Sequence, residues 1–215
     1  MIRTFTTTLV AATAVCASTI AAHGAVLVGN DISHFDRSQN GDSVNVFYTN
    51  HVAMPGDGTV DAVHVAYQGG SGSMQSFQLI QLRSTGVEGE YTIVNMSDVL
   101  DLTGYTVDEV AVLSLGTPWE VLAGDIFGFY GAGIPFETLD NVDWDSNEQP
   151  TYYQAGFTWT YNAGDTFSLS DLPQLPSPTF DRDYGYAVSF IPEPASLALL
   201  GLGGLVMLRR RSGDR

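Results

Sequence analysis

The sequence predicts an all-β protein whose body is an antiparallel β-sandwich of the jelly-roll type. Three observations lead to this fold class. Short segments that alternate apolar and polar residues recur along the chain, clusters of Gly, Asp, Asn and Ser separate them, and no stretch of the body has a convincing helical period. About nine or ten strands at regular spacing, without an internal repeat, are typical of a sandwich and not of a solenoid or propeller.

Four strands are expected in the first half of the body. Residues 60–67 alternate clearly, with valine and tyrosine on one face and alanine and histidine on the other. Residues 77–82 change apolar phase between Leu79 and Ile80, which predicts a β-bulge. The other two strands of this half are 43–49 and 91–94.

Turn-forming residues separate these strands. The sequence Pro-Gly-Asp-Gly at 55–58 and the Gly- and Ser-rich stretch 69–73 predict loops. Residues 97–102 are the one place where a short helix or turn is expected, with Ser97 as its N-cap.

The second half of the body supplies the remaining strands. The near-continuous apolar run 107–115 predicts a buried strand. The cleanest alternation, 184–190, places Tyr184, Tyr186 and Val188 on the inward face. The other expected strands are 118–122, 126–130, 152–161 and 165–169.

The N-terminus predicts export. Arg3 precedes the apolar stretch 9–22 and small residues follow it, so residues 1–24 are interpreted as a secretory signal peptide. The single cysteine, Cys16, lies within this segment. The body, residues 25–190, is therefore expected to have neither disulfides nor thiol chemistry.

The C-terminal segment, residues 191–215, has three parts in a fixed order. They are Pro192, Glu193 and Pro194, then the apolar run 195–208, then Arg209, Arg210 and Arg211. Because the prolines restrict the backbone and remove N–H donors, the folded body is expected to end by Ile191 and to be followed by a stiff, exposed strip. A helix over 195–208 would be about 21 Å long, shorter than the ~30 Å hydrocarbon core, and the arginines would hold its end on the cytoplasmic side.

This tail resembles the PEP-CTERM sorting signal of exopolysaccharide-producing bacteria. The resemblance implies that a membrane enzyme, exosortase, cleaves near Pro192, Glu193 and Pro194, which would be a substrate and not a catalyst. It also implies that 195–208 enters the inner membrane only transiently, before the protein reaches the cell surface or the extracellular matrix. Similar tails occur on some ice-binding proteins, but ice binding would need a flat threonine array, and the threonines here form no such ladder.

The body is strongly acidic. Of the 24 acidic residues only Glu193 and Asp214 lie in the tail, which leaves 22 in the body against three basic residues, Arg37, Arg83 and Arg182, and a net charge of about −19. Such a charge repels nucleic acid and anionic lipid, so neither is expected as a partner of the body.

An acidic loop is the candidate metal site. Asp143, Asp145 and Asn147 place oxygen ligands on alternate residues, and Asp140 and Glu148 lie close to them. Calcium prefers such ligands, but Glu148 stands where an EF-hand needs glycine, so an EF-hand is excluded. A calcium site in a loop of the sandwich and a plain acidic loop remain as alternatives.

Tryptophans are the candidate carbohydrate contacts. Trp119, Trp144 and Trp159 could each stack on a sugar ring. Trp159 alternates in phase with Phe157 and therefore suits the core. Trp144, on the acidic loop, is the best single candidate for an exposed contact.

The chain lacks the usual catalytic patterns. It contains no Gly-x-Ser-x-Gly sequence, and His34, His51 and His64 do not have the spacing of metal ligands. Carboxylate pairs suited to glycoside hydrolysis would arise by chance among so many acids, so none is named.

These observations favour a non-enzymatic protein of the cell envelope or exopolysaccharide matrix, with an exosortase as its processing partner. A calcium-assisted carbohydrate-binding module is the first alternative, and a secreted glycan-active enzyme is the second. Apart from calcium, no cofactor is expected.

Overall fold

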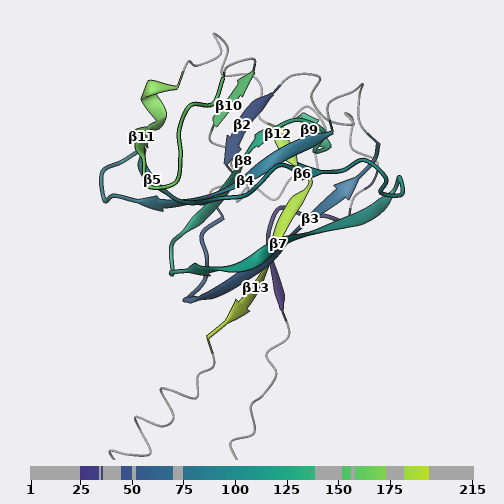
Figure 1. The fold of residues 1–215 in the computed structure, drawn as a ribbon, viewed down its shortest axis with the longest axis horizontal. Coiled ribbons are helices and arrows are strands. Elements are labelled where there is room, and N and C mark those ends of the chain that lie inside the picture. The colour runs from purple at the N-terminus through teal and green to yellow at the C-terminus, as the bar shows by residue number, and fades with distance from the viewer. Residues whose placement is uncertain are drawn as a thin grey trace, which may run out of the picture. The chain divides into compact units, whose positions relative to one another are not determined.

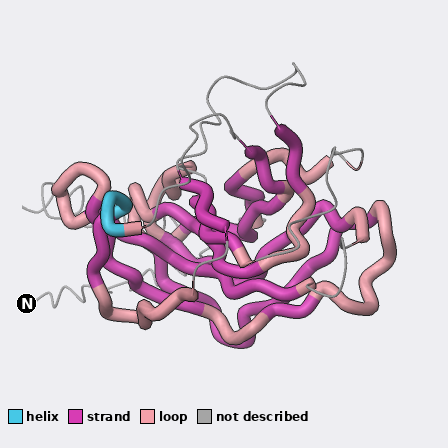
Figure 2. The backbone as a smooth tube through the Cα atoms, turned by 90° about the horizontal axis from the view of Figure 1, so that it is seen from above, coloured by secondary structure: helices cyan, strands magenta, loops and turns pink. Residues whose placement is uncertain are grey.

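The fold is built almost entirely from antiparallel strands (Figures 1 and 2). A computed structural model describes residues 25–33, 35, 45–49, 52–69, 75–138, 152–155, 158–172 and 182–193. Within these ranges the only helical segment is the short 3-10 turn Leu169–Asp171. No helix in the described ranges is long and apolar enough to span a bilayer. The prediction of an all-β, antiparallel protein is confirmed, whereas the signal peptide and the 195–208 helix lie outside the described residues.

The first sheet has four strands in the spatial order β1-β13-β3-β7. Their bounds are Val26–Gly29 for β1, Tyr186–Pro192 for β13, Gly58–Tyr67 for β3 and Glu109–Val121 for β7. Every pair is antiparallel, with Val188 opposite both Val28 and Val63. The first and last described strands of the body are therefore neighbours.

The second sheet has seven strands, six of them in the order β10-β2-β8-β4-β5-β11, with β6 paired to β4. The bounds are Tyr152–Ala155 for β10, Val46–Thr49 for β2, Ile126–Gly131 for β8, Ser76–Ser84 for β4, Glu90–Met96 for β5, Thr166–Ser168 for β11 and Leu100–Asp101 for β6. A separate pair joins β9, Phe136–Thr138, to β12, Arg182–Tyr184.

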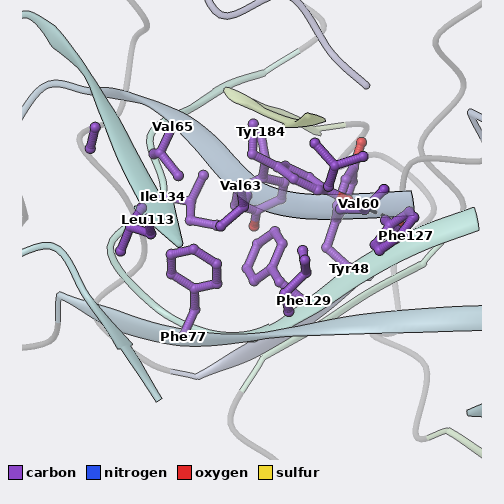
Figure 3. Close-up of a cluster of buried hydrophobic side chains, with 14 of the residues drawn as sticks. Tyr48, Val60, Val63, Val65, Phe77, Leu113, Phe127, Phe129, Ile134 and Tyr184 are labelled. Carbon is purple, nitrogen blue, oxygen red and sulfur yellow. Dashed lines mark hydrogen bonds between the residues drawn. The ribbon is translucent and has the colours of Figure 1, made fainter. Parts of the chain in front are cut away.

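Side chains from both sheets meet in one apolar cluster (Figure 3). Val63 and Leu113 come from the four-stranded sheet, and Phe77 and Phe129 come from the seven-stranded sheet; all four are at most 6 % exposed. Burial of such side chains is the main favourable term in folding, at about 25 cal/mol per Å² of apolar surface. This shared cluster holds the two sheets together.

A second apolar cluster covers the other face of the seven-stranded sheet. Ile80, Leu82 and Ile93 pack there against Phe167, from the segment that follows residue 158. Because this sheet is covered on both faces, β4 is apolar on both faces, with Leu79 in the first cluster and Ile80 in the second. The bulge predicted between these two residues is therefore wrong: the register shift lies two residues later, between Gln81 and Leu82, where β4 pairs with β5.

Five other predicted elements differ from the structure. Residues 118–121 form the end of β7 and not a separate strand, and 184–190 is divided between β12 and β13. Residues 97–102 form no helix, and Ser97 instead accepts a hydrogen bond from the backbone N–H of Leu79 at 2.9 Å. The strand predicted at 107–115 is half-exposed, because it lies at a sheet edge with Val110 and Val112 turned outward. Of the described residues in 152–161, only Tyr152–Ala155 form a strand.

Candidate functional site

The sequence singled out the acidic loop for calcium binding and its Trp144 for a carbohydrate contact. Asp140, Asp143, Trp144, Asp145, Asn147 and Glu148 all lie outside the described residues. The calcium site and the Trp144 contact therefore stay predictions. The described part of the chain presents a different candidate, a groove beside β7.

A large bulge in β7 forms one wall of this groove. On β3 a single residue, Asp61, separates the paired positions Val60 and Ala62, whereas on β7 their partners Trp119 and Ser114 are separated by residues 115–118. Gly116 permits the bend, since its φ is 76°, a conformation that residues with a Cβ rarely adopt. Bulges of this kind bend a strand and redirect its side chains.

The groove runs between this part of β7 and neighbouring residues of β4 and β5, and its volume is about 580 Å³. Half of its lining is apolar and half is polar. The lining residues are Arg83, Val94, Asn95, Thr117, Pro118, Trp119, Glu120 and Leu122. A hollow of this size and mixed character fits a small polar ligand or one unit of a polymer.

A buried carboxylate organises the polar side of the groove. Asp125, only 1 % exposed, accepts hydrogen bonds from Arg83 Nε at 2.7 Å and Arg83 Nη2 at 2.8 Å, from Gln81 Nε2 at 2.7 Å and from the Leu122 N–H at 2.9 Å. Burial raises the pKa of Asp125, but the hydrogen bonds from Arg83, Leu122 and Gln81 outweigh it, so the pKa lies below its ordinary value. Asp125 is therefore ionised at neutral pH.

Gln81 connects this carboxylate to both walls of the groove. Its side-chain amide donates to the backbone carbonyl of Glu120 on β7 at 3.0 Å, and its carbonyl oxygen accepts from Asn95 Nδ2 on β5 at 2.7 Å. Gln81 is fully buried, so these hydrogen bonds replace the water that it loses. The positions of Asn95 and Arg83 are fixed from beneath by this network.

Trp119 is the aromatic member of the groove. It is partly buried against the shared cluster, and its ring stacks on Phe127 with centroids 6.3 Å apart and planes inclined by 9°. The indole is therefore held in one orientation by the core while part of it lines the groove. Trp159, in contrast, stacks on Phe47 at 4.9 Å in the second cluster, as its assignment to the core predicted.

His64 lies outside the groove, on the outer face of the four-stranded sheet. It stands between Ala187 on β13 and Val112 on β7 and is half-buried, as expected for a cross-strand residue. Burial lowers its pKa, and the nearby Asp61 carboxylate raises it by less. His64 is therefore neutral at pH 7.

The sorting tail begins inside the first sheet. The strand β13 continues through Ile191 opposite Thr59 and Pro192 opposite Gly58, and the Glu193 N–H donates to the carbonyl of Asp57 at 3.0 Å. The expectation that the folded body ends by Ile191 is therefore wrong by about two residues. Proline is tolerated here because it lies at the end of the strand, where a missing N–H removes little pairing.

Sequence reasoning named Trp119 but missed Arg83, Asn95 and the network beneath them. A signal was present in β4, where strict alternation places Gln81 and Arg83 on the same face as Phe77 and Leu79. Polar side chains on a core-facing row need buried partners. Their partner Asp125 lies more than forty residues away, so only the fold identifies it.

The chain matches the PEP-CTERM protein-sorting motif over residues 190–212. No curated protein and no solved structure matches the chain. The tail therefore indicates sorting to the cell envelope by an exosortase, a membrane enzyme, and the family of the body is not recognised. The match begins at Phe190, inside β13, so the sorting motif and the folded body overlap.

Proposed function

We propose that the protein is a non-enzymatic component of the extracellular polysaccharide matrix that is sorted through its tail. The motif at 190–212 is the observation that carries this proposal, since such tails direct export and processing at the membrane. The body's net charge of about −19 supports it, because an acidic surface stays soluble among polysaccharides and avoids anionic lipid. The mature protein would lie at the cell surface or in the matrix.

The body is proposed to be a jelly-roll β-sandwich. In an eight-stranded jelly roll, the first, eighth, third and sixth strands form one sheet, and the second, seventh, fourth and fifth form the other. The observed orders β1-β13-β3-β7 and β2-β8-β4-β5 correspond to this arrangement when the other five strands, β6 and β9 to β12, are set aside. The apolar cluster shared by both sheets is further support.

A non-enzymatic role is supported by the carboxylates at the groove. Glycoside hydrolysis needs two, and the proton donor of the pair needs a raised pKa. Glu120 is the acidic side chain in the groove lining, and Asp125 beneath it has a lowered pKa and is engaged by Arg83. Asp125 is thus unsuited to donate a proton at neutral pH.

The test measures the cell fraction and the intact mass of the protein in its producing cells. Parent cells are compared with cells lacking the exosortase and with cells expressing a variant in which Pro192, Glu193 and Pro194 are all alanine. The parent is expected in the matrix fraction with both ends missing by intact-mass measurement, and the other two in the membrane fraction. A mature matrix species that still carries Arg209–Arg211, or equal fractionation of all three, would refute the proposal.

A further inference from the structure

We propose that the groove between β7 and β5 binds an uncharged sugar unit of a polysaccharide. This inference rests on the proposed matrix function and adds to it a binding site and a ligand class. The ligand would lie along Trp119 and receive hydrogen bonds from Arg83 and Asn95. The site is distinct from the acidic loop 140–150, which the sequence marked for calcium.

The groove has the construction of a ligand site. The bulge at residues 115–118 interrupts an otherwise regular pairing of β3 with β7 and opens a hollow of about 580 Å³ at the edge of the sheet. Ligand sites commonly have volumes of roughly 300–1,000 Å³ and combine apolar walls with a few placed polar groups. The open edge also allows a polymer to extend beyond the unit that is bound.

The aromatic wall of the groove is rigid. A sugar ring presents a face of C–H groups, which packs well on an aromatic ring. Trp119 offers such a ring, and its stacking on Phe127 fixes its orientation before any ligand arrives. A side chain that is already ordered loses little conformational entropy on binding, which favours affinity.

Arg83 and Asn95 supply hydrogen-bonding groups to the groove. Arg83 uses two of its five N–H donors on Asp125, and its side chain is 39 % exposed. Asn95 donates to Gln81 through its nitrogen, and among the described residues its carbonyl oxygen accepts no hydrogen bond. Held from beneath, these groups present donors and an acceptor to the groove, the combination that hydroxyl groups require.

The charge balance selects an uncharged ligand. The Arg83 guanidinium is already paired with Asp125, and the exposed carboxylate of Glu120 also lines the groove. An acidic sugar would therefore meet a local negative charge in a body whose net charge is about −19. A neutral sugar avoids this repulsion.

The experiment is a calorimetric titration of the full-length chain, kept in a detergent without a sugar headgroup. The probes are neutral hexasaccharides of glucose, mannose and galactose, with a galacturonic acid hexasaccharide for comparison. At least one neutral hexasaccharide is expected to bind, equally well in calcium and in EDTA, and more tightly than the acidic one. Export and matrix retention are not read in this assay, so its result and that of the fractionation test are independent.

Variants locate the binding to the groove. Asn95→Ala and Trp119→Phe are each expected to weaken binding about tenfold while melting as folded proteins, the effect of losing one hydrogen-bonding group or much of a stacking surface. Glu120→Gln removes the negative charge from the groove lining. Glu109→Gln is its matched control, because Glu109 is also an exposed glutamate on β7 but does not line the groove. Neither glutamine variant should strengthen neutral-sugar binding.

Four outcomes would overturn the inference. They are no binding of any neutral hexasaccharide, binding that Asn95→Ala and Trp119→Phe leave unchanged, binding that requires calcium, and preference for the galacturonic acid probe. The third would move the site to the acidic loop. The fourth, accompanied by tighter binding in Glu120→Gln, would identify an acidic polysaccharide as the ligand.

Discussion

Asp125 shows how one residue can connect a turn to a ligand-binding surface. It follows Gly124, whose φ of 89° closes the turn between β7 and β8, and its carboxylate is removed from water. An isolated buried charge is costly, and it becomes acceptable only when paired and hydrogen-bonded. Arg83, Gln81 and the Leu122 N–H provide those partners and are themselves positioned by it.

Replacing Asp125 by asparagine should lower stability by about 1–3 kcal/mol at pH 7, because Arg83 loses its ion pair and the hydrogen bonds weaken. The folded-state pKa lies below 3.8, so the stabilisation by the ionised group is complete above about pH 5 and is lost as the pH falls through the unfolded-state value to the folded-state pKa. The difference between parent and variant in urea unfolding should therefore stay constant from pH 5 to 8 and shrink below pH 3.8.

Asp98→Asn is the control, since Asp98 is exposed. It should melt close to the parent throughout this range. A difference between parent and Asp125→Asn that persists undiminished to pH 2 would contradict the role given to the ionised carboxylate.

The end of β13 is the element in which body and sorting tail meet. Ile191 and Pro192 are paired with β3, and the Glu193 N–H is bound to Asp57, so the first residues of the cleavage motif are held in the sheet. An enzyme that binds its substrate as an extended chain would need this end to separate from β3. Local opening of a strand end requires much less free energy than global unfolding.

Gly58→Ala should loosen this end of β13. A Cβ at position 58 would overlap the carbonyl oxygen of Ile191 and lie 2.6 Å from Cε2 of Phe190, so the two strands would have to separate. The expected loss of stability is about 1–3 kcal/mol, the usual cost of overpacking. Amide hydrogen exchange at Glu193, measured by NMR, should be slow in the parent and markedly faster in the variant.

Gly56→Ala is the matched control, because a Cβ at position 56 meets no atom within 4 Å. Its exchange at Glu193 should equal that of the parent. If Glu193 exchanges in the parent at the rate of an unstructured peptide, the motif is not held by the sheet.

At the scale of the whole molecule, charge is the dominant feature. With about 22 acids and three basic residues, the body repels itself in the compact state. Added salt screens this repulsion over a Debye length of about 10 Å at 0.1 M, so the melting temperature should rise with ionic strength.

Calcium should raise the melting temperature further if the loop at 140–148 binds it. Binding to the folded form alone would add about 2.7 kcal/mol at a hundredfold excess over the dissociation constant. The measurement compares millimolar calcium with sodium at matched ionic strength, on the parent and on Asp143→Asn/Asp145→Asn. An equal rise in both salts, or in both proteins, would leave the loop as a plain acidic surface.

Features that depend on local pattern could be predicted from the sequence. Period-two alternation in 184–190 correctly placed Tyr184, Tyr186 and Val188 in the core, where each is at most 1 % exposed. The order of prolines, apolar run and arginines identified the sorting tail, since recognition of such a motif needs only contiguous residues. The antiparallel all-β class follows from the same short-range regularity.

The tertiary structure decided what depends on pairing between distant segments. The alternation of 77–82 could not reveal that Leu79 and Ile80 belong to two clusters, because the second is built by residues after 158. The groove exists because β7 has four residues where β3 has one, and Arg83, Asn95 and Trp119 meet only in that register. Sequence alone determined the antiparallel all-β class and the sorting of the chain. The strand register determined the candidate site, because hydrogen bonds and side-chain packing between distant segments set that register together.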